Sequence, residues 1–418
     1  MQVFKFGGAS VKDAESIKNI ATILKKFDDI NKTVVVSAMG KTTNALEDVV
    51  NLYVKKDDKY IEYLHEIREY HAFVSDDLFG KGNNIEYKIF ALFDRIENFC
   101  TSNISENYTF IYDQIISVGE LASSLLISEY LKSIGMENQW VDAREIIRTD
   151  HAYTDAQVLW DETQKLVQSK YASITTKTSI TQGFIGSTSE RFTTTLGREG
   201  SDFTAAILSY CLNAEKMVIW KDVEGVMNAD PKQFTDAVLL KEIAFKEAIE
   251  MTYYGAKVIH PKTIRPLQNK NIPLEVRSFI KSDKGGTLIH TFNKEIEYPP
   301  IIVVKENQVL LHFSAKDFSF IAENHMKEIF GAFAEVRLRM NIMQNGAISF
   351  AAAVDNKTEK ITEIINLLEE HFTIKTTENL DLLTIRHYDD HILNRELASK
   401  VIWLTQKTRE TIQVLCKV

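Results

Sequence analysis

The sequence predicts an α/β fold with a mostly parallel sheet, followed by a smaller α+β region of the ferredoxin-like kind. Compact β-rich runs at 3–6 and 33–37 flank a helical stretch at 13–27, which is the βαβ pattern of a parallel sheet. The same alternation resumes in the segments 179–184, 202–210 and 217–220. The chain has 418 residues, too many for one ordinary core, so several domains are expected.

The order of elements divides the chain into two parts at Pro299-Pro300. We expect a first domain over 1–298, with a largely helical part at 44–115. We expect two ferredoxin-like units over 299–418, the second of them short. The elements predicted for this tail are a hairpin from 301–304 and 309–314, helices at 324–334 and 360–371, and strands at 348–354, 382–386, 402–406 and 411–416.

Bulk composition excludes several classes of partner. The net charge of −9, from 49 basic and 58 acidic residues, argues against a general nucleic-acid binder. A strand begins at Gln2, so no signal peptide fits, and no apolar run approaches the length of a membrane span. The three cysteines, Cys100, Cys211 and Cys416, are scattered, which predicts buried reduced thiols. We therefore expect a cytoplasmic protein with no nucleic-acid and no membrane partner.

Two glycine-containing turns follow predicted strands and lead into helices. The first, Lys5-Phe6-Gly7-Gly8, can offer backbone N–H groups and a lysine to an anion. Taken alone, Gly-Gly after a strand is more often an ordinary tight turn. The sequence contains neither the G-x-x-x-x-G-K-[ST] phosphate loop nor the G-x-G-x-x-G dinucleotide pattern.

The second turn runs through Gly197, Arg198 and Gly200 to Ser201 and Asp202. Arg198 can bind a carboxylate with two parallel hydrogen bonds, although a solvated arginine is an equal alternative for the isolated motif. Asp202 falls at a predicted helix start, where it could be merely a favourable N-terminal acid. A phosphate and an acid are the ligands that two such sites indicate.

Further candidates lie on the same domain. Ser37 to Asn44 follows the second strand, where hydroxyl groups suit a ligand cleft, while Thr43 or Asn44 could simply cap a helix. Glu120, beside Gly119 on a predicted helix, could bind a substrate ammonium, and the alternative is a solvated glutamate.

The strand and loop from Trp220 to Pro231 could wrap a nucleotide, or form an ordinary surface loop. Lys257 comes just after a predicted helix, and His260 precedes a proline and is interpreted as structural.

Together these motifs resemble those of the aspartate kinases, members of the amino-acid kinase superfamily. The motifs that carry the resemblance are Lys5 to Ser10, Thr195 to Asp202, Asp222 to Gly225, Ala229 to Pro231 and Tyr254 to Pro261. The resemblance implies the three-layer amino-acid-kinase sandwich followed by regulatory ACT domains. It implies transfer of the ATP γ-phosphoryl group to the β-carboxylate of L-aspartate, the first step towards lysine, threonine and methionine.

The resemblance also implies roles for particular residues. The nucleotide is expected to contact Lys5, Phe6, Gly7, Gly8, Ser37, Lys221, Asp222, Lys232 and Lys257. Aspartate is expected to contact Thr43, Glu120, Arg198 and Ser201, with Glu120 on its ammonium and Arg198 on a carboxylate. Lys5, Asp202 and Lys257 are the expected catalytic residues.

The chemistry agrees with this assignment. A carboxylate nucleophile with a pKa near ~4 is already ionised at neutral pH, so no general base is required. Alignment and neutralisation of phosphate charge suffice, and lysines, backbone N–H groups and Mg²⁺ carried by ATP would supply them. We expect no metal site built from the protein's own side chains.

The sequence departs from the family pattern at several positions. Glu199 replaces a common Gly, Met227 replaces a Tyr near the nucleotide, and Gln344 to Ser349 lacks the Ser-Glu of relatives that bind an inhibitory amino acid. The resemblance implies an amino-acid effector at the ACT region, a homodimer or higher homo-oligomer, and, since no dehydrogenase domain follows Val418, the monofunctional type.

Two other functions stay open. One is a kinase of the same fold acting on another acid, such as an acylated glutamate, although Glu120 with Arg198 favours a free α-amino acid. The other is a catalytically silent amino-acid sensor, against which the presence of Lys5, Asp202 and Lys257 argues.

Overall fold

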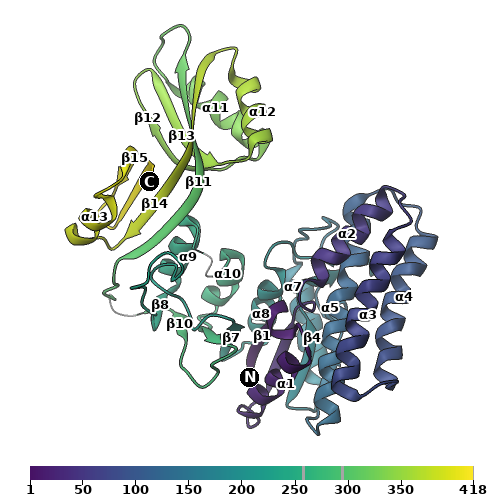
Figure 1. The fold of residues 1–418 in the computed structure, drawn as a ribbon. Helices are drawn as coiled ribbons and strands as arrows, with labels where there is room; N and C mark the ends of the chain where they lie inside the picture. The colour runs from purple at the N-terminus through teal and green to yellow at the C-terminus, as the bar shows by residue number, and fades with distance from the viewer. Residues whose placement is uncertain (257–258, 293–295, 418) are drawn as a thin grey trace. The chain divides into compact units, whose positions relative to one another are not determined.

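The structure is a computed structural model that describes residues 1–256, 259–292 and 296–417. The chain divides into two compact units. The first unit comprises Met1–Val226 with 239–248 and the described part of 259–293, and the second comprises 227–238, 249–256 and the described residues from 296 onward. Figure 1 shows the elements of both.

The first unit is built on an eight-stranded sheet in the order β3-β4-β2-β1-β7-β9-β10-β8. Every neighbouring pair is parallel except β9 and β10, which confirms the predicted α/β class with a mostly parallel sheet. Its strands are β1 (Gln2–Phe6), β2 (Lys32–Val36), β3 (Gln139–Val141), β4 (Thr178–Gln182), β7 (Lys216–Lys221), β8 (Glu242–Ala244), β9 (Leu274–Ser278) and β10 (Thr287–His290). A separate two-stranded sheet pairs β5 (Ile185–Ser187) with β6 (Thr193–Thr195).

Helices pack on this sheet and extend away from it. The predicted helical part at 44–115 is present as a bundle formed by α2, α3, α4 and the start of α5. The helices of the first unit are α1 (Ala14–Lys25), α2 (Thr42–Val54), α3 (Tyr60–Phe79), α4 (Asn84–Ser102), α5 (Tyr108–Ser133), α6 (Ala143–Ile146), α7 (Trp160–Ala172), α8 (Gly200–Cys211) and α10 (Pro261–Asn269), with the 3-10 helix η1 (Gly8–Val11). Helix α9 (Phe245–Tyr254) begins in the first unit and ends in the second.

Helix α5 corrects one expectation. By length and composition it is apolar enough to cross a membrane, contrary to the expectation that no run approaches that length. However, 78% of the relevant window is buried inside the protein, as in the core helix of a globular domain. The helix contacts β2, β3 and β4, as well as α2 and α4.

The second unit contains a six-stranded antiparallel sheet in the order β12-β13-β11-β14-β16-β15. Its first half has the βαββαβ order of a ferredoxin-like fold, with two helices over a common core. The elements are β11 (Ile301–Ala315), α11 (Glu323–Val336), β12 (Met340–Asn345), β13 (Ser349–Asp355), α12 (Thr358–Leu368), β14 (Phe372–Arg386), α13 (Asp390–Leu397), β15 (Val401–Lys407) and β16 (Thr411–Lys417).

The hairpin predicted from 301–304 and 309–314 is wrong, because these residues form the single 15-residue strand β11. Both of its halves pair antiparallel with β14, and the polar residues between them form an irregularity in the pairing near 305–310. Asn307 has a φ of 54°, the left-handed conformation that asparagine tolerates, which accommodates the extra residue without reversing the chain.

The second half of this sheet carries α13, and the segment 227–238 adds to its core. Ala229, Phe234 and Ala237 pack with Ile385 and Val414. The segment is tied to the same unit by bonds from Asn228 Nδ2 to the Pro300 carbonyl oxygen, 2.8 Å, and from Arg395 to Asp236, 2.7 Å. Residues 227–238 and 249–256 therefore group with the tail by contact, although they lie within the predicted first domain.

Candidate functional site

A cavity of about 700 Å³ opens in the first unit beside the carboxyl ends of β1 and β2 and the start of α8. Ligands of open α/β sheets commonly bind at this edge of the sheet. The cavity is lined by Lys5, Ser37, Thr43, Glu47, Tyr108, Tyr112, Glu120, Thr154, Phe184, Gly197, Arg198, Glu199, Gly200, Ser201 and Asp202. Six of the predicted residues thus come together with Lys5: Ser37, Thr43, Glu120, Arg198, Ser201 and Asp202.

The turn after β1 is closed tightly against the turn after β2. A Cβ atom on Gly8 would lie 2.9 Å from the Gly40 carbonyl oxygen and 3.0 Å from that of Ala38, so no side chain fits there. The Gly40 N–H donates to the Gly8 carbonyl oxygen at 3.1 Å, which joins the two turns. Phe6 is fully buried and stacks on Trp220 with ring centroids 6.0 Å apart, so a nucleotide could contact only its main chain.

Lys5 and Asp202 form a buried ion pair at the base of the cavity, with Nζ 2.7 Å from Oδ1. Their side chains are 11% and 3% exposed, so little water screens the pair. Burial opposes ionisation of Asp202, but Lys5, Lys221 and hydrogen bonding outweigh it and lower the pKa of this carboxyl group. Asp202 is therefore more than a favourable helix-terminal acid, since it holds the Lys5 ammonium in place.

The turn before α8 presents Arg198 at the cavity wall. Gly197 has a φ of 73°, and a Cβ there would lie 2.5 Å from Asp155 Oδ1. Glu199 occupies the N-cap position of α8 with a left-handed φ of 56° and is exposed. Among the residues that the structure describes, no carboxylate forms an ion pair with Arg198. The start of α8 also adds its unpaired N–H groups and positive dipole end to this side.

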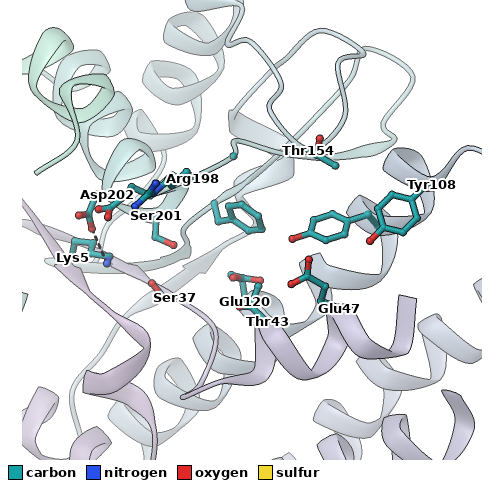
Figure 2. A pocket seen from close by; sticks show the side chains of 15 residues that line it. Lys5, Ser37, Thr43, Glu47, Tyr108, Glu120, Thr154, Arg198, Ser201 and Asp202 are labelled. Carbon is teal, nitrogen blue, oxygen red and sulfur yellow. Dashed lines mark ion pairs between the residues drawn. The ribbon is translucent and has the colours of Figure 1, made fainter. Parts of the chain in front are cut away.

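Glu120 lies opposite these cations and is buried, not solvated as the alternative interpretation proposed. It is 3% exposed, and its Oε2 atom has no hydrogen-bond partner within the described part of the chain. Burial raises the pKa of Glu120 to about 8, although hydrogen bonds with its own and the Ala38 backbone favour ionisation. Figure 2 shows Glu120 beside Thr43, across the cavity from Arg198 and the Lys5–Asp202 pair.

Thr43 is not a helix cap, because α2 begins at Thr42 with Lys41 as its N-cap. Its hydroxyl group is thus available to the cavity. His260, by contrast, is the N-cap of α10 and accepts from the Lys262 N–H at 3.2 Å, which confirms its structural interpretation.

Sequence reasoning missed one end of the cavity. Glu47, Tyr108 and Thr154 lie together at the end away from Lys5 in Figure 2, and Tyr112 and Phe184 also line the cavity. Glu47 follows Thr43 by four residues on α2 and so shares its face, which is a signal that the sequence did contain. Burial and the nearby Glu47 charge raise the pKa of Tyr112 to about 12.

The remaining nucleotide candidates are distributed differently. Lys221 ends β7 next to β1, and it helps to lower the pKa of Asp202. Asp222 follows it and is exposed. Lys232 and Met227 belong to the second unit, and Lys257 lies outside the described residues, so their roles stay predictions.

The arrangement defines a polarised cavity. Two cations, Lys5 and Arg198, and a helix N-terminus lie on one side, and the carboxyl groups of Glu120 and Glu47 line the other. A small molecule that carries both carboxylate and ammonium groups would satisfy both sides.

Comparisons with known proteins agree with this geometry. The sequence model described as the amino acid kinase family matches residues 1–278. The chain is 33% identical over 361 residues to lysine-sensitive aspartokinase 3 of Escherichia coli, covering 84% of this chain and 78% of that protein. It is 34% identical over 298 residues to a chloroplastic bifunctional aspartokinase/homoserine dehydrogenase 1 of Arabidopsis thaliana, covering 69% of this chain and only 32% of that longer protein.

Solved structures extend the similarity over the whole chain. E. coli aspartokinase III with lysine and aspartate superimposes with a TM-score of 0.83 at 28% identity, covering 99% of this chain and 95% of that one. The same enzyme with aspartate and ADP gives a TM-score of 0.82, also at 28% identity, covering 100% and 96%. The fold is therefore shared with a solved aspartokinase. The chain belongs to the amino acid kinase family and, within it, to the aspartokinases.

Proposed function

We propose that this protein transfers the γ-phosphoryl group of ATP to the β-carboxylate of L-aspartate. The observation that carries the proposal is the buried Glu120 carboxyl group, whose Oε2 has no partner in the described ranges and lies across the cavity from Arg198 and Lys5. A free amino acid supplies an ammonium to Glu120 and a carboxylate to Arg198, neither of which has an ion-pair partner among the described residues. The similar E. coli aspartokinase III has been solved with aspartate and ADP.

Phosphoryl transfer needs alignment and charge neutralisation more than proton transfer. Arg198 would hold one substrate carboxylate and Glu120 the ammonium, which directs the other carboxylate towards the nucleotide. Lys5, fixed by Asp202 at 2.7 Å, would stabilise negative charge on the transferred group. The α8 N-terminus, with its N–H groups and positive dipole end, would help.

Mg²⁺ is proposed to enter with the nucleotide, where it would neutralise phosphate charge. Mg²⁺ commonly binds through one or two carboxylates together with substrate phosphates. Asp202 is a cavity carboxylate of suitable chemistry, and its lowered pKa keeps it ionised.

Hydroxylamine trapping tests this proposal, because it converts an acyl phosphate into a stable hydroxamate. With ATP, Mg²⁺ and L-aspartate, we expect aspartate-dependent hydroxamate. Product with another acid but not with aspartate would favour a different kinase of the fold. If no acid gave a product, the remaining function would be that of a catalytically silent amino-acid sensor.

We also propose that the second unit is regulatory and binds an amino acid. Its first half has the βαββαβ order of a ferredoxin-like fold, and the similar E. coli enzyme has been solved with lysine. The segment Gln344 to Ser349 covers the end of β12, the turn at 346–348 and the start of β13, and the Gly346 N–H donates to the Ser349 carbonyl oxygen at 2.7 Å. Adding lysine, threonine or methionine to the hydroxamate assay would show which of them inhibits.

A homodimer formed through the sheet edges of this unit is also proposed. Strands β12 and β15 are the two edges of the six-stranded sheet, and β15 exposes Val401, Ile402 and Trp403. A monomer by light scattering at micromolar concentration would contradict it.

A reducing cytoplasm as the compartment is likewise proposed, since Cys100, Cys211 and Cys416 are buried free thiols.

A further inference from the structure

Helix α5 carries a second buried carboxyl group, Asp113, seven residues before Glu120. Seven residues are two helical turns, so both side chains leave the same face of α5, roughly 10 Å apart along its axis. Asp113 is fully buried, although it does not itself line the cavity.

The Asp113 carboxylate accepts hydrogen bonds from two segments that are distant in sequence. The Thr195 N–H donates to Oδ2 at 2.8 Å, and the Thr195 hydroxyl donates to Oδ1 at 2.7 Å. The Thr154 N–H donates to both oxygens, at 3.1 Å and 3.2 Å. All of these donors are neutral, and within the described residues no lysine or arginine forms an ion pair with Asp113.

A buried carboxylate without a cation is costly, and burial raises the pKa of Asp113 to about 6 despite the hydrogen bonds. An asparagine could not replace it well, because its amide NH₂ would face an N–H donor. The position therefore uses a group that accepts at both of its oxygens.

Both segments held by Asp113 shape the substrate cavity. Thr154 lines the cavity with a φ of 71°, a left-handed conformation that is strained for a β-branched residue and needs external support. Thr195 ends β6 and comes three residues before Arg198. The Ala156 N–H donates to the Thr195 carbonyl oxygen at 3.0 Å, which joins the two segments beside the carboxylate.

We propose that Asp113 is a positioning residue, which fixes the Thr154 wall and the 195–198 turn so that Arg198 meets the substrate carboxylate. The inference rests on the proposed aspartokinase activity and assigns no contact between Asp113 and substrate. Helix α5 then contributes to the cavity in two ways. Glu120 lines it directly, and Asp113 holds in place the two segments, at Thr154 and Thr195, that form part of its wall.

The test compares Asp113→Asn with the wild-type protein in the hydroxamate assay. Because misplaced Arg198 weakens aspartate binding and leaves the Lys5–Asp202 pair intact, we expect the KM for aspartate to rise about tenfold or more. The KM for ATP should stay within about twofold and kcat within about threefold, a split that general loss of structure would not give. Glu129→Gln removes another carboxylate of α5, one paired with Lys88 at 2.6 Å and Lys132 at 2.9 Å, and should change none of these values.

A milder pair of variants decides the matter if Asp113→Asn fails to fold. Thr195→Val removes only the hydroxyl bond to Asp113, and should raise the KM for aspartate by about twofold to fivefold. Thr194→Val is its matched control, since it removes a buried hydroxyl bond of 2.7 Å to Thr149 from the same strand without touching Asp113.

Unchanged KM values for aspartate in Asp113→Asn, or equal values in the two threonine variants, would overturn the positioning role. A wild-type protein that forms no hydroxamate would instead contradict the proposed function, so the two failures are distinguishable.

Discussion

Glu120 gives the sharpest prediction, because its ionisation must change when substrate binds. Its pKa of about 8 in the cavity compares with a usual value of 4.5. A shift of that size corresponds to about 5 kcal/mol of preference for the neutral form, as an upper bound. An ammonium placed beside Glu120 requires the ionised form, so binding aspartate must release the proton.

The magnitude follows from the same pKa. At pH 7 about 0.9 of the Glu120 carboxyl groups are protonated in the empty cavity. The apparent Kd for aspartate should therefore fall about ninefold from pH 6 to 7 and about fivefold from pH 7 to 8, and level off above.

Titration calorimetry measures this directly. In buffers of different ionisation enthalpy, the binding heat at pH 7 should report about 0.9 proton released per aspartate bound. The Glu120→Gln variant should bind aspartate weakly, release no such proton, and lose the part of the pH dependence of Kd that Glu120 causes. Subtracting the pH profile of this variant from that of wild type removes the contributions of Asp113 and His260. A wild-type Kd that is constant from pH 6 to 8, with buffer-independent heat, would refute the reasoning.

Three further predictions follow from named contacts. Without substrate, Glu120 keeps its proton to higher pH in the folded protein than in the unfolded chain, so the free energy of unfolding falls as pH rises from about 4.5 to 8. The Glu120→Gln variant should therefore melt at a higher temperature than wild type at pH 8.5 but not at pH 4. Lys5→Ala should abolish hydroxamate formation and also cost about 3 kcal/mol in a denaturant titration, because it removes the 2.7 Å ion-pair partner of the buried Asp202; equal stability would contradict the importance of this pair. Gly8→Ala should lose about 1–3 kcal/mol, since its Cβ would lie 2.9 Å from a carbonyl oxygen, and an unchanged melting temperature would show that the turns can separate.

Much of the first unit was predictable because its central strands are short and largely buried. β1 and β2 appear in sequence as compact apolar runs on either side of a helix, and a parallel sheet requires this alternation. The segments 178–182 and 216–221 are strands close to the predicted ranges 179–184 and 217–220 for the same reason. Their shared edge then brings Lys5, Ser37 and Asp202 to one cavity.

Glu120 shows where sequence reasoning stopped. Helix α5 is buried on most of its surface through contacts with β2, β3, β4, α2 and α4, and these contacts come from distant parts of the chain. A glutamate in such a helix cannot be distinguished from a solvated one until the neighbours are known. The same holds for Asp113, whose partners at 154 and 195 lie far along the chain.

The hairpin predicted in the tail failed for a different reason. The polar run from Lys305 to Asn307 has the composition of a turn, yet β14 is long enough to pair with β11 on both sides of it. Pairing partners override local composition where a long neighbouring strand is available. Nothing in the sequence indicated that Ala229, Phe234 and Ala237 pack into the core of the second unit, because their partners Ile385 and Val414 lie more than a hundred residues away.

The most direct test of the account compares L-aspartate with N-acetyl-L-aspartate as phosphoryl acceptors. The two acids share both carboxylates and differ in the ammonium that Glu120 is proposed to bind. We predict a kcat/KM ratio of about a thousandfold or more in favour of L-aspartate, falling at least tenfold in Glu120→Gln. Equal use of the two acids by the wild-type protein would contradict the assignment of Glu120 and of the free amino acid as substrate.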